Sequence, residues 1–169
     1  AIKSGDKPSP TDRDSATGLI NYGFDASGNL YFKGNITHCG VIVLAQTYND
    51  DLAYHYGENI GDESYYLGVD GWYAPAVNMH RTAFSGRNSE YYSEDPFVGG
   101  HIASLECEGV ASRGMYVFVK HYAINDQEDH RGDREGQYSI ATFLNEQAAR
   151  EIYLKPFEIA VRESDPWSV

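Results

Sequence analysis

Residues 114–121 read Gly114-Met115-Tyr116-Val117-Phe118-Val119-Lys120-His121, and this stretch decides the fold. Residues 115–120 are mostly β-branched and aromatic and follow a glycine, a pattern typical of a strand buried in a parallel sheet. Because ligands bind at the carboxyl ends of parallel strands, Lys120 and His121 are candidate site residues. The strand alone leaves an alternative equally open, in which Lys120 extends to solvent at the rim and His121 hydrogen-bonds to a neighbouring carbonyl.

Strand and helix patterns alternate along the rest of the chain. The first half predicts a hairpin with its turn at 25–29, a strand at 41–45, a helix at 51–67 capped by Asn49 or Asp50 and stopped by Gly68, and a strand at 72–77 interrupted by Pro75. The second half predicts a helix from Asp95 to Gly114, the strand at 115–120, a helix at about 139–163 kinked or split at Pro156, and the start of a further strand at 166–169.

This order of elements predicts an α/β fold of right-handed, parallel βα units. A complete (β/α)8 barrel takes about 250 residues, whereas this chain of 169 residues supplies three βα units and the start of a strand. We therefore predict an irregular N-terminal segment over 1–40 and part of a TIM-like (β/α)8 barrel, incomplete in this chain, over 41–169. A small open sheet is the alternative.

The composition excludes several classes of partner. A net charge of −12 disfavours nucleic acid, because a phosphate backbone requires a basic face. No apolar run approaches the roughly 20 residues that span a bilayer, so no membrane partner is expected. Cys39 and Cys107 are too few for a disulfide framework and too far apart for a metal knuckle. The compartment, cytoplasmic or secreted, stays open.

The loops after the second and third predicted strands gather most of the residues that could carry chemistry. Residues 78–95 and 121–137 contain several Arg and His side chains as well as carboxylates, and Lys120 lies beside them. Arginine and lysine only donate hydrogen bonds, so a pocket lined by them suits a ligand rich in acceptor oxygens, such as a sugar or an anion. For residues 128–135 a solvated, salt-bridged loop is the alternative interpretation.

A metal-dependent hydrolase is a rival interpretation of the same loops. Its ligands would be His80, His121 and His130 with Asp126 or Glu128. The spacings of these histidines match no known ligand motif. We therefore predict no metal and no cofactor.

Three motifs carry a family resemblance: Gly86-Arg87-Asn88-x-Glu90-Tyr91-Tyr92-Ser93-Glu94-Asp95-Pro96, Lys120-His121-Tyr122-Ala123-x-Asn125-Asp126-Gln127-Glu128 and Arg150-Glu151-Ile152-Tyr153-Leu154-Lys155-Pro156-Phe157-Glu158. In order and spacing they resemble the first domain of family 3 glycoside hydrolases of the β-glucosidase type, over about residues 44–169. The resemblance implies a (β/α)8-like barrel and a retaining β-glycosidase that hydrolyses terminal non-reducing β-D-glucosyl residues.

The resemblance also implies which residues bind substrate. Arg87, Lys120, His121 and Arg131 would hydrogen-bond the hydroxyls of the sugar in the −1 subsite. The family has an early aspartate in an Asp-Gly-Pro turn that binds the outer hydroxyls of this sugar. Asp6 is its candidate counterpart, although Lys7 replaces the glycine.

A retaining glycosidase needs two carboxylates about 5–5.5 Å apart, one as nucleophile and one as acid/base. The resemblance implies that the nucleophilic aspartate lies on a later strand and the acid/base glutamate in a second domain, so no catalytic residue is expected in this chain. Asp165 is predicted to be a turn residue. The expected partners are a β-linked glucoside or oligosaccharide and the remaining barrel and second domain, on another chain or missing. The alternative is a non-catalytic carbohydrate-binding or interaction subunit.

Overall fold

The computed structural model describes residues 10–20, 22–32, 36–128, 131–132, 140–166 and 168–169. Its elements are β1 (Asp12–Asp14), β2 (Tyr22–Phe24), β3 (Leu30–Phe32), α1 (Val41–Gln46), α2 (Asp50–Leu67), β4 (Gly71–Tyr73), the 3-10 helix η1 (Asn88–Glu90), α3 (Pro96–Ser112), β5 (Tyr116–Val117), α4 (Glu146–Ala148), the π-helix η3 (Ala149–Tyr153) and α5 (Lys155–Ser164). Among these residues, no helix has both the length and the apolar character that a membrane span requires.

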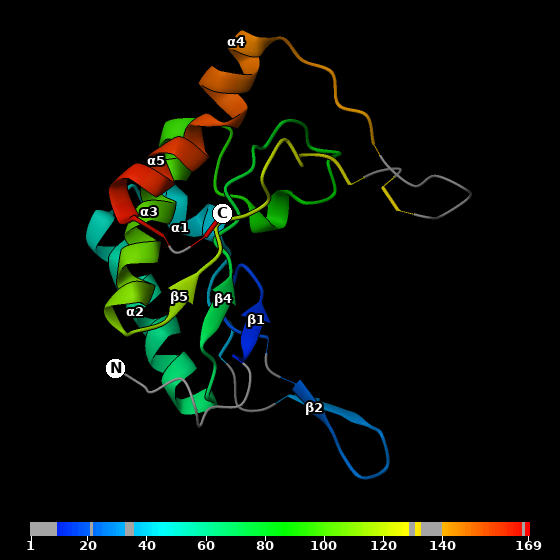
Figure 1. Cartoon of the computed structure of the whole chain (residues 1–169), viewed down its shortest axis with the longest axis vertical. Coiled ribbons are helices and arrows are strands. Elements are labelled where there is room, and N and C mark those ends of the chain that lie inside the picture. Colours follow the sequence, from blue (N-terminus) through cyan, green and yellow to red (C-terminus); the bar gives the residue numbers. More distant parts are fainter. Residues whose placement is uncertain (1–9, 21, 33–35, 129–130, 133–139, 167) are drawn as a thin grey trace.

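The central sheet is parallel and has the order β1-β4-β5, so β4 lies between the other two strands (Figure 1). Isolated parallel bridges extend it, one between Ala76 and Lys120 and one between Phe118 and Ser168. Helix α3 contacts β5, and α2 and α5 pack on either side of α3. Parallel strands alternating with helices form an incomplete TIM-like barrel, as predicted from the sequence.

The capping residues fix the limits of the two long helices as predicted. The side chain of Asn49 accepts a hydrogen bond from Leu52 N, and α2 ends at Gly68, which has the left-handed φ of 66°. The side chain of Asp95 accepts from two backbone N–H groups at the start of α3, and Pro96 is the first residue of that helix. Each cap satisfies backbone donors that the first helical turn leaves unpaired.

The predicted strand at 41–45 is wrong, because these residues form helix α1. Val41, Leu44 and Ala45 are buried whereas Val43 is 54% exposed, which is the spacing of a helical face. The first strand of the sheet is β1, inside the segment predicted to be irregular. The division of the chain at residue 40 stays a prediction.

The C-terminal helix is shorter than predicted. Residues 140–145 are not helical, and residue 139 lies outside the described residues. Pro156 is near the start of α5, so the break expected at this proline is confirmed. Ser168 pairs with Phe118 in the parallel sense, which confirms that a further strand position begins there. The predicted hairpin is also confirmed, as β2 and β3 pair antiparallel around residues 25–29.

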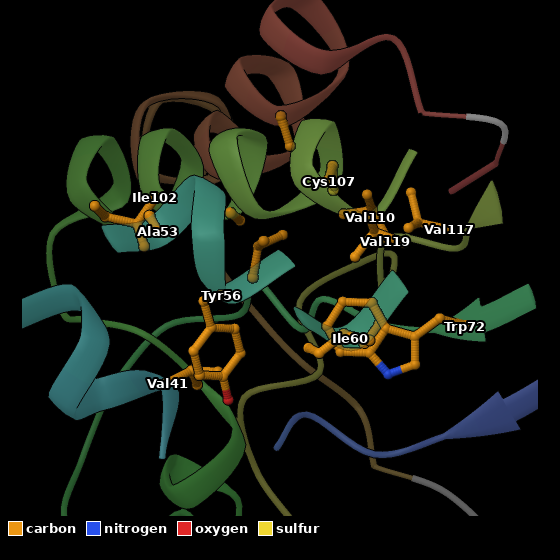
Figure 2. Close-up of a cluster of buried hydrophobic side chains, with 14 of the residues drawn as sticks. Val41, Ala53, Tyr56, Ile60, Trp72, Ile102, Cys107, Val110, Val117 and Val119 are labelled. Atoms are coloured by element: carbon orange, nitrogen blue, oxygen red, sulfur yellow. The ribbon is translucent and has the colours of Figure 1, made fainter. Parts of the chain in front are cut away.

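Helices α2 and α3 approach each other closely because glycines face each other at the crossing. A Cβ atom at Gly109 would lie 2.1 Å from the carbonyl oxygen of Tyr54, and one at Gly57 would lie 2.1 Å from that of Glu106. Figure 2 shows the core that forms around this contact. Its buried side chains include Ala53, Tyr56 and Ile60 of α2, Ile102, Cys107 and Val110 of α3, and Trp72, Val117 and Val119 from the strand region.

We predict that Gly109→Ala destabilises the chain by about 1–3 kcal/mol, because the added methyl meets backbone atoms that do not yield easily. Gly99→Ala, in the same helix, is the matched control. Its new Cβ would meet only Tyr92 Cβ at 3.8 Å, so stability should stay unchanged or rise by about 0.5–1 kcal/mol. Urea denaturation of the two variants checks this, and equal stabilities would contradict the close helix contact.

Candidate functional site

The candidate site lies where β4 and β5 continue beyond their last paired residues. Lys120 N donates to Pro75 O at 2.9 Å, and Val77 N donates to Lys120 O at 2.8 Å. This pairing keeps the two segments parallel up to Asn78 and His121. The loops that follow therefore start side by side at the carboxyl edge of the sheet.

Arg87 and His121, predicted from the sequence as site residues, are in direct contact. Nη2 of Arg87 lies 2.8 Å from Nε2 of His121. Arg87 Nε donates to Glu90 Oε1 at 2.6 Å, which orients the guanidinium. Burial, together with the positive charges of Arg87 and Lys120, lowers the pKa of His121 to about 4, although the charge of Asp14 opposes this. His121 is therefore neutral at pH 7.

Arg131 joins the same group through a shared carboxylate. Oε2 of Glu128 lies 2.8 Å from Nη1 of Arg131 and 3.5 Å from Nη1 of Arg87. The side chains of Arg131 and Glu128 are 45% and 42% exposed, so this pair contributes little to stability. A solvated, salt-bridged loop therefore describes this pair as well, and the sugar-binding role of Arg131 stays a prediction.

Lys120 makes its ion pair with Asp14, at the end of β1. Burial would raise the pKa of Asp14, but the hydrogen bond and the charge of Lys120 hold it below its ordinary value. Asp14 was missed by the sequence reasoning because the strand that carries it was not recognised. The predicted candidate Asp6 lies outside the described residues.

Two hydrogen bonds join the loop after β4 to the loop after β5. Glu128 N donates to Ser85 O at 2.8 Å, and Tyr91 Oη donates to Asn125 O at 2.7 Å. Tyr91 is fully buried. These contacts hold Arg87 and Glu128, which are far apart in the sequence, on facing loops.

The described residues of the rival metal interpretation do not form a metal-binding group. His80 Nε2 lies 2.8 Å from Tyr91 O and 3.0 Å from Asn88 O, so it serves as a donor to backbone carbonyls. His130 lies outside the described residues. Within the part of the chain that the structure describes, no group of three His, Cys, Asp or Glu side chains could hold a metal ion. Asp165 is the left-handed residue that ends α5, as expected for a turn residue.

The arrangement can bind a ligand that has both hydrogen-bond donors and acceptors. Arg87, Lys120 and Arg131 offer only donors, whereas the neutral ring of His121 and the carboxylate of Asp14 offer acceptors. A hydroxyl group donates and accepts at once. A polyhydroxylated ligand therefore matches the chemistry of these groups.

Comparisons with known proteins all identify the same family. The model of the glycosyl hydrolase family 3 N terminal domain matches residues 29–169. The chain is 41% identical over 141 residues to beta-glucosidase B of Emericella nidulans, covering 82% of this chain and 16% of that protein. It is 42% identical over 124 residues to beta-glucosidase A of Butyrivibrio fibrisolvens, covering 73% of this chain and 14% of that protein.

Solved structures agree with these sequence relatives. The structure of beta-glucosidase 3B from Thermotoga neapolitana in complex with alpha-D-glucose superposes with a TM-score of 0.82 at 41% identity, covering 94% of this chain and 21% of that chain. Beta-glucosidase from Kluyveromyces marxianus gives 0.82 at 29% identity, covering 93% and 18%. The chain thus spans about a sixth of the length of the curated relatives it matches.

We predict that NMR titration of His121 gives a pKa near 4, below the ordinary value of 6.5. Arg87→Gln should raise this pKa, because it removes a neighbouring positive charge. In the unfolded chain His121 should have its ordinary pKa of 6.5, so the unfolded state takes up the proton at a higher pH than the folded state. His121 should therefore lower folding stability as the pH falls from about 6.5 to about 4. Arg150→Gln, in an exposed pair with Glu146, is the control and should leave the pKa unchanged. An ordinary pKa in the unsubstituted chain would contradict the buried contact.

Proposed function

The chain belongs to glycosyl hydrolase family 3, and we propose from this that it supplies the sugar-binding side of the −1 subsite of a retaining β-glucosidase-type enzyme. The proposed substrate is a terminal non-reducing β-D-glucosyl residue of a glucoside or oligosaccharide. The matched relatives are named beta-glucosidases.

One observation carries this proposal: Arg87, Lys120 and Arg131 are gathered around the imidazole of His121. Arg87 touches His121 directly, and the charges of all three cationic side chains act on the imidazole. These groups stand at the carboxyl ends of parallel strands, where barrel enzymes bind their substrates. Donors and acceptors side by side match the vicinal hydroxyls of a sugar.

We propose further that the two catalytic carboxylates come from outside these residues. A retaining glycosidase needs one carboxylate as nucleophile and one as acid/base, about 5–5.5 Å apart. Asp14, Glu90 and Glu128 each form an ion pair with a cationic side chain of the site. Their arrangement suits binding and orientation rather than covalent chemistry. The remainder of the barrel and a second domain are thus the proposed partners.

Binding by the purified chain tests the proposed subsite. We expect calorimetry to detect glucose or gluconolactone binding, and Arg87→Leu and Lys120→Leu to weaken it about tenfold or more, because each loses a charge-assisted hydrogen bond of about 1.5–3 kcal/mol. Arg150→Leu, at an exposed pair away from the site, is the matched control. Unchanged affinity in the Arg87 and Lys120 variants would contradict the proposal.

Turnover assays test whether the catalytic carboxylates lie outside these residues. The purified chain should not hydrolyse a chromogenic β-glucoside, and hydrolysis that survives Asp165→Asn would place the catalytic carboxylates inside these residues. A chimera in which this chain replaces the matching segment of the Thermotoga neapolitana enzyme should hydrolyse the glucoside. Arg87→Leu in that chimera should abolish most of this activity. A folded chimera that binds glucose without turnover would favour a non-catalytic carbohydrate-binding subunit instead.

A further inference from the structure

Asn78 is a buried polar residue whose side chain serves the candidate site rather than the core. It is only 3% exposed. Its neighbours in the chain are both fixed, because Val77 N donates to Lys120 O and Met79 N donates to Asp126 Oδ1. The backbone of Asn78 is thus held from the β5 side at two points, which leaves its amide facing His121.

The amide of Asn78 makes three contacts, all with His121. Oδ1 accepts from His121 N at 2.7 Å and lies 3.3 Å from His121 Nδ1. Nδ2 donates to His121 O at 3.1 Å. The orientation of the amide is therefore fixed by the backbone, since Oδ1 must face the N–H group and Nδ2 the carbonyl.

The two ring nitrogens of His121 then have different roles. Arg87 can only donate, so Nε2, at 2.8 Å from its Nη2, must carry a lone pair. In a neutral ring the proton is then on Nδ1, where the oxygen of Asn78 is the acceptor within reach. Arg87 and Asn78 therefore favour the same tautomer, with the proton on Nδ1 and the lone pair on Nε2.

We propose that Asn78 is a positioning residue that holds His121 as the neutral Nδ1–H tautomer, which makes Nε2 an uncharged hydrogen-bond acceptor next to the donors of Arg87. The hydrogen bond made by one ring nitrogen sets the role of the other. The lowered pKa of His121 is consistent with a ring that stays neutral.

The consequence for the ligand rests on the proposed function. Nε2 has a single lone pair, which accepts from Arg87, so a ligand group must insert between the two side chains, accept a hydrogen bond from Arg87 and donate one to Nε2. A hydroxyl satisfies both requirements, whereas a carboxylate oxygen has no proton to donate. Asn78 would thus select a neutral polyol over a sugar acid at this point of the subsite.

The tautomer is measurable in the free chain by ¹⁵N NMR of the imidazole ring at pH 7. We expect a pyrrole-type Nδ1 and a pyridine-type Nε2 for His121. Because Arg87 favours the same tautomer, the decisive comparison is made in Arg87→Leu. There the Nδ1–H form should persist with Asn78 and give way to Nε2–H when Asn78→Leu is added. An Nε2–H ring in the unsubstituted chain, or an unchanged tautomer in the double variant, would overturn the proposal.

Asn78→Asp separates positioning from mere packing, because it keeps an oxygen opposite Nδ1 and adds a negative charge. We expect it to retain the Nδ1–H tautomer and to raise the pKa of His121 by at least one unit. This variant decides the matter even if Asn78→Leu fails to fold. A pKa that does not move would overturn the proposal.

Calorimetry with glucose and glucuronate then tests the proposed preference for a neutral polyol over a sugar acid. The unsubstituted chain should bind glucose at least about tenfold more tightly than glucuronate, and Asn78→Leu should reduce this preference. If the unsubstituted chain binds neither compound, the proposed function fails, while the NMR result still decides the role of Asn78. If both proteins bind glucose and the ratio of glucose to glucuronate affinity is the same in the unsubstituted chain and in Asn78→Leu, the selective role of Asn78 is refuted.

Discussion

Parallel hydrogen bonding between residues 75–77 and Lys120 is the constraint on which the candidate site depends. It extends the pairing of β4 with β5 beyond the regular strands and thereby brings Asn78 to His121. The side chain of Asn78 then hydrogen-bonds to the backbone of a residue more than forty positions away. The close packing of α2 on α3 and the contact of α3 with β5 hold the sheet behind this edge. The geometry of the site is thus a property of the sheet, although most of its side chains are on loops.

Helix limits could be predicted where a single residue determines them. Asn49, Gly68 and Asp95 each act through local hydrogen bonds or backbone conformation, which the sequence displays directly. The run at 41–45 could not be assigned in the same way, because five apolar residues fit a buried strand and a buried helix equally well. The helix start at Asn145, which caps Ala148 N at 2.8 Å, carried a signal that the apolar pattern over 139–163 concealed.

The family, inferred from three motifs, and the fold class, inferred from the order of the elements and from that resemblance, are confirmed by the matched family model and solved structures. Within the site, Lys120 and His121 were predictable because they follow a strongly apolar strand, and Arg87 because its motif is distinctive. Asp14 was not predictable, because β1 has the polar sequence Asp-Arg-Asp and becomes a strand only by pairing with β4. Asn78 could not be recognised either, since its role depends on a contact across the sheet and not on any local pattern.

The charges of the candidate site are balanced locally, although the chain as a whole is acidic. The whole chain carries −12, yet Arg87, Lys120 and Arg131 stand together with a carboxylate beside each. An incoming anion would have to displace these carboxylates and would meet their repulsion. A hydroxyl instead inserts between donor and acceptor, accepting from Arg87 and donating to His121, so the charges of the pocket stay as they are. Under the proposed function, these ion pairs favour a polyol over an anion, because a hydroxyl that enters between donor and acceptor leaves no charge unpaired.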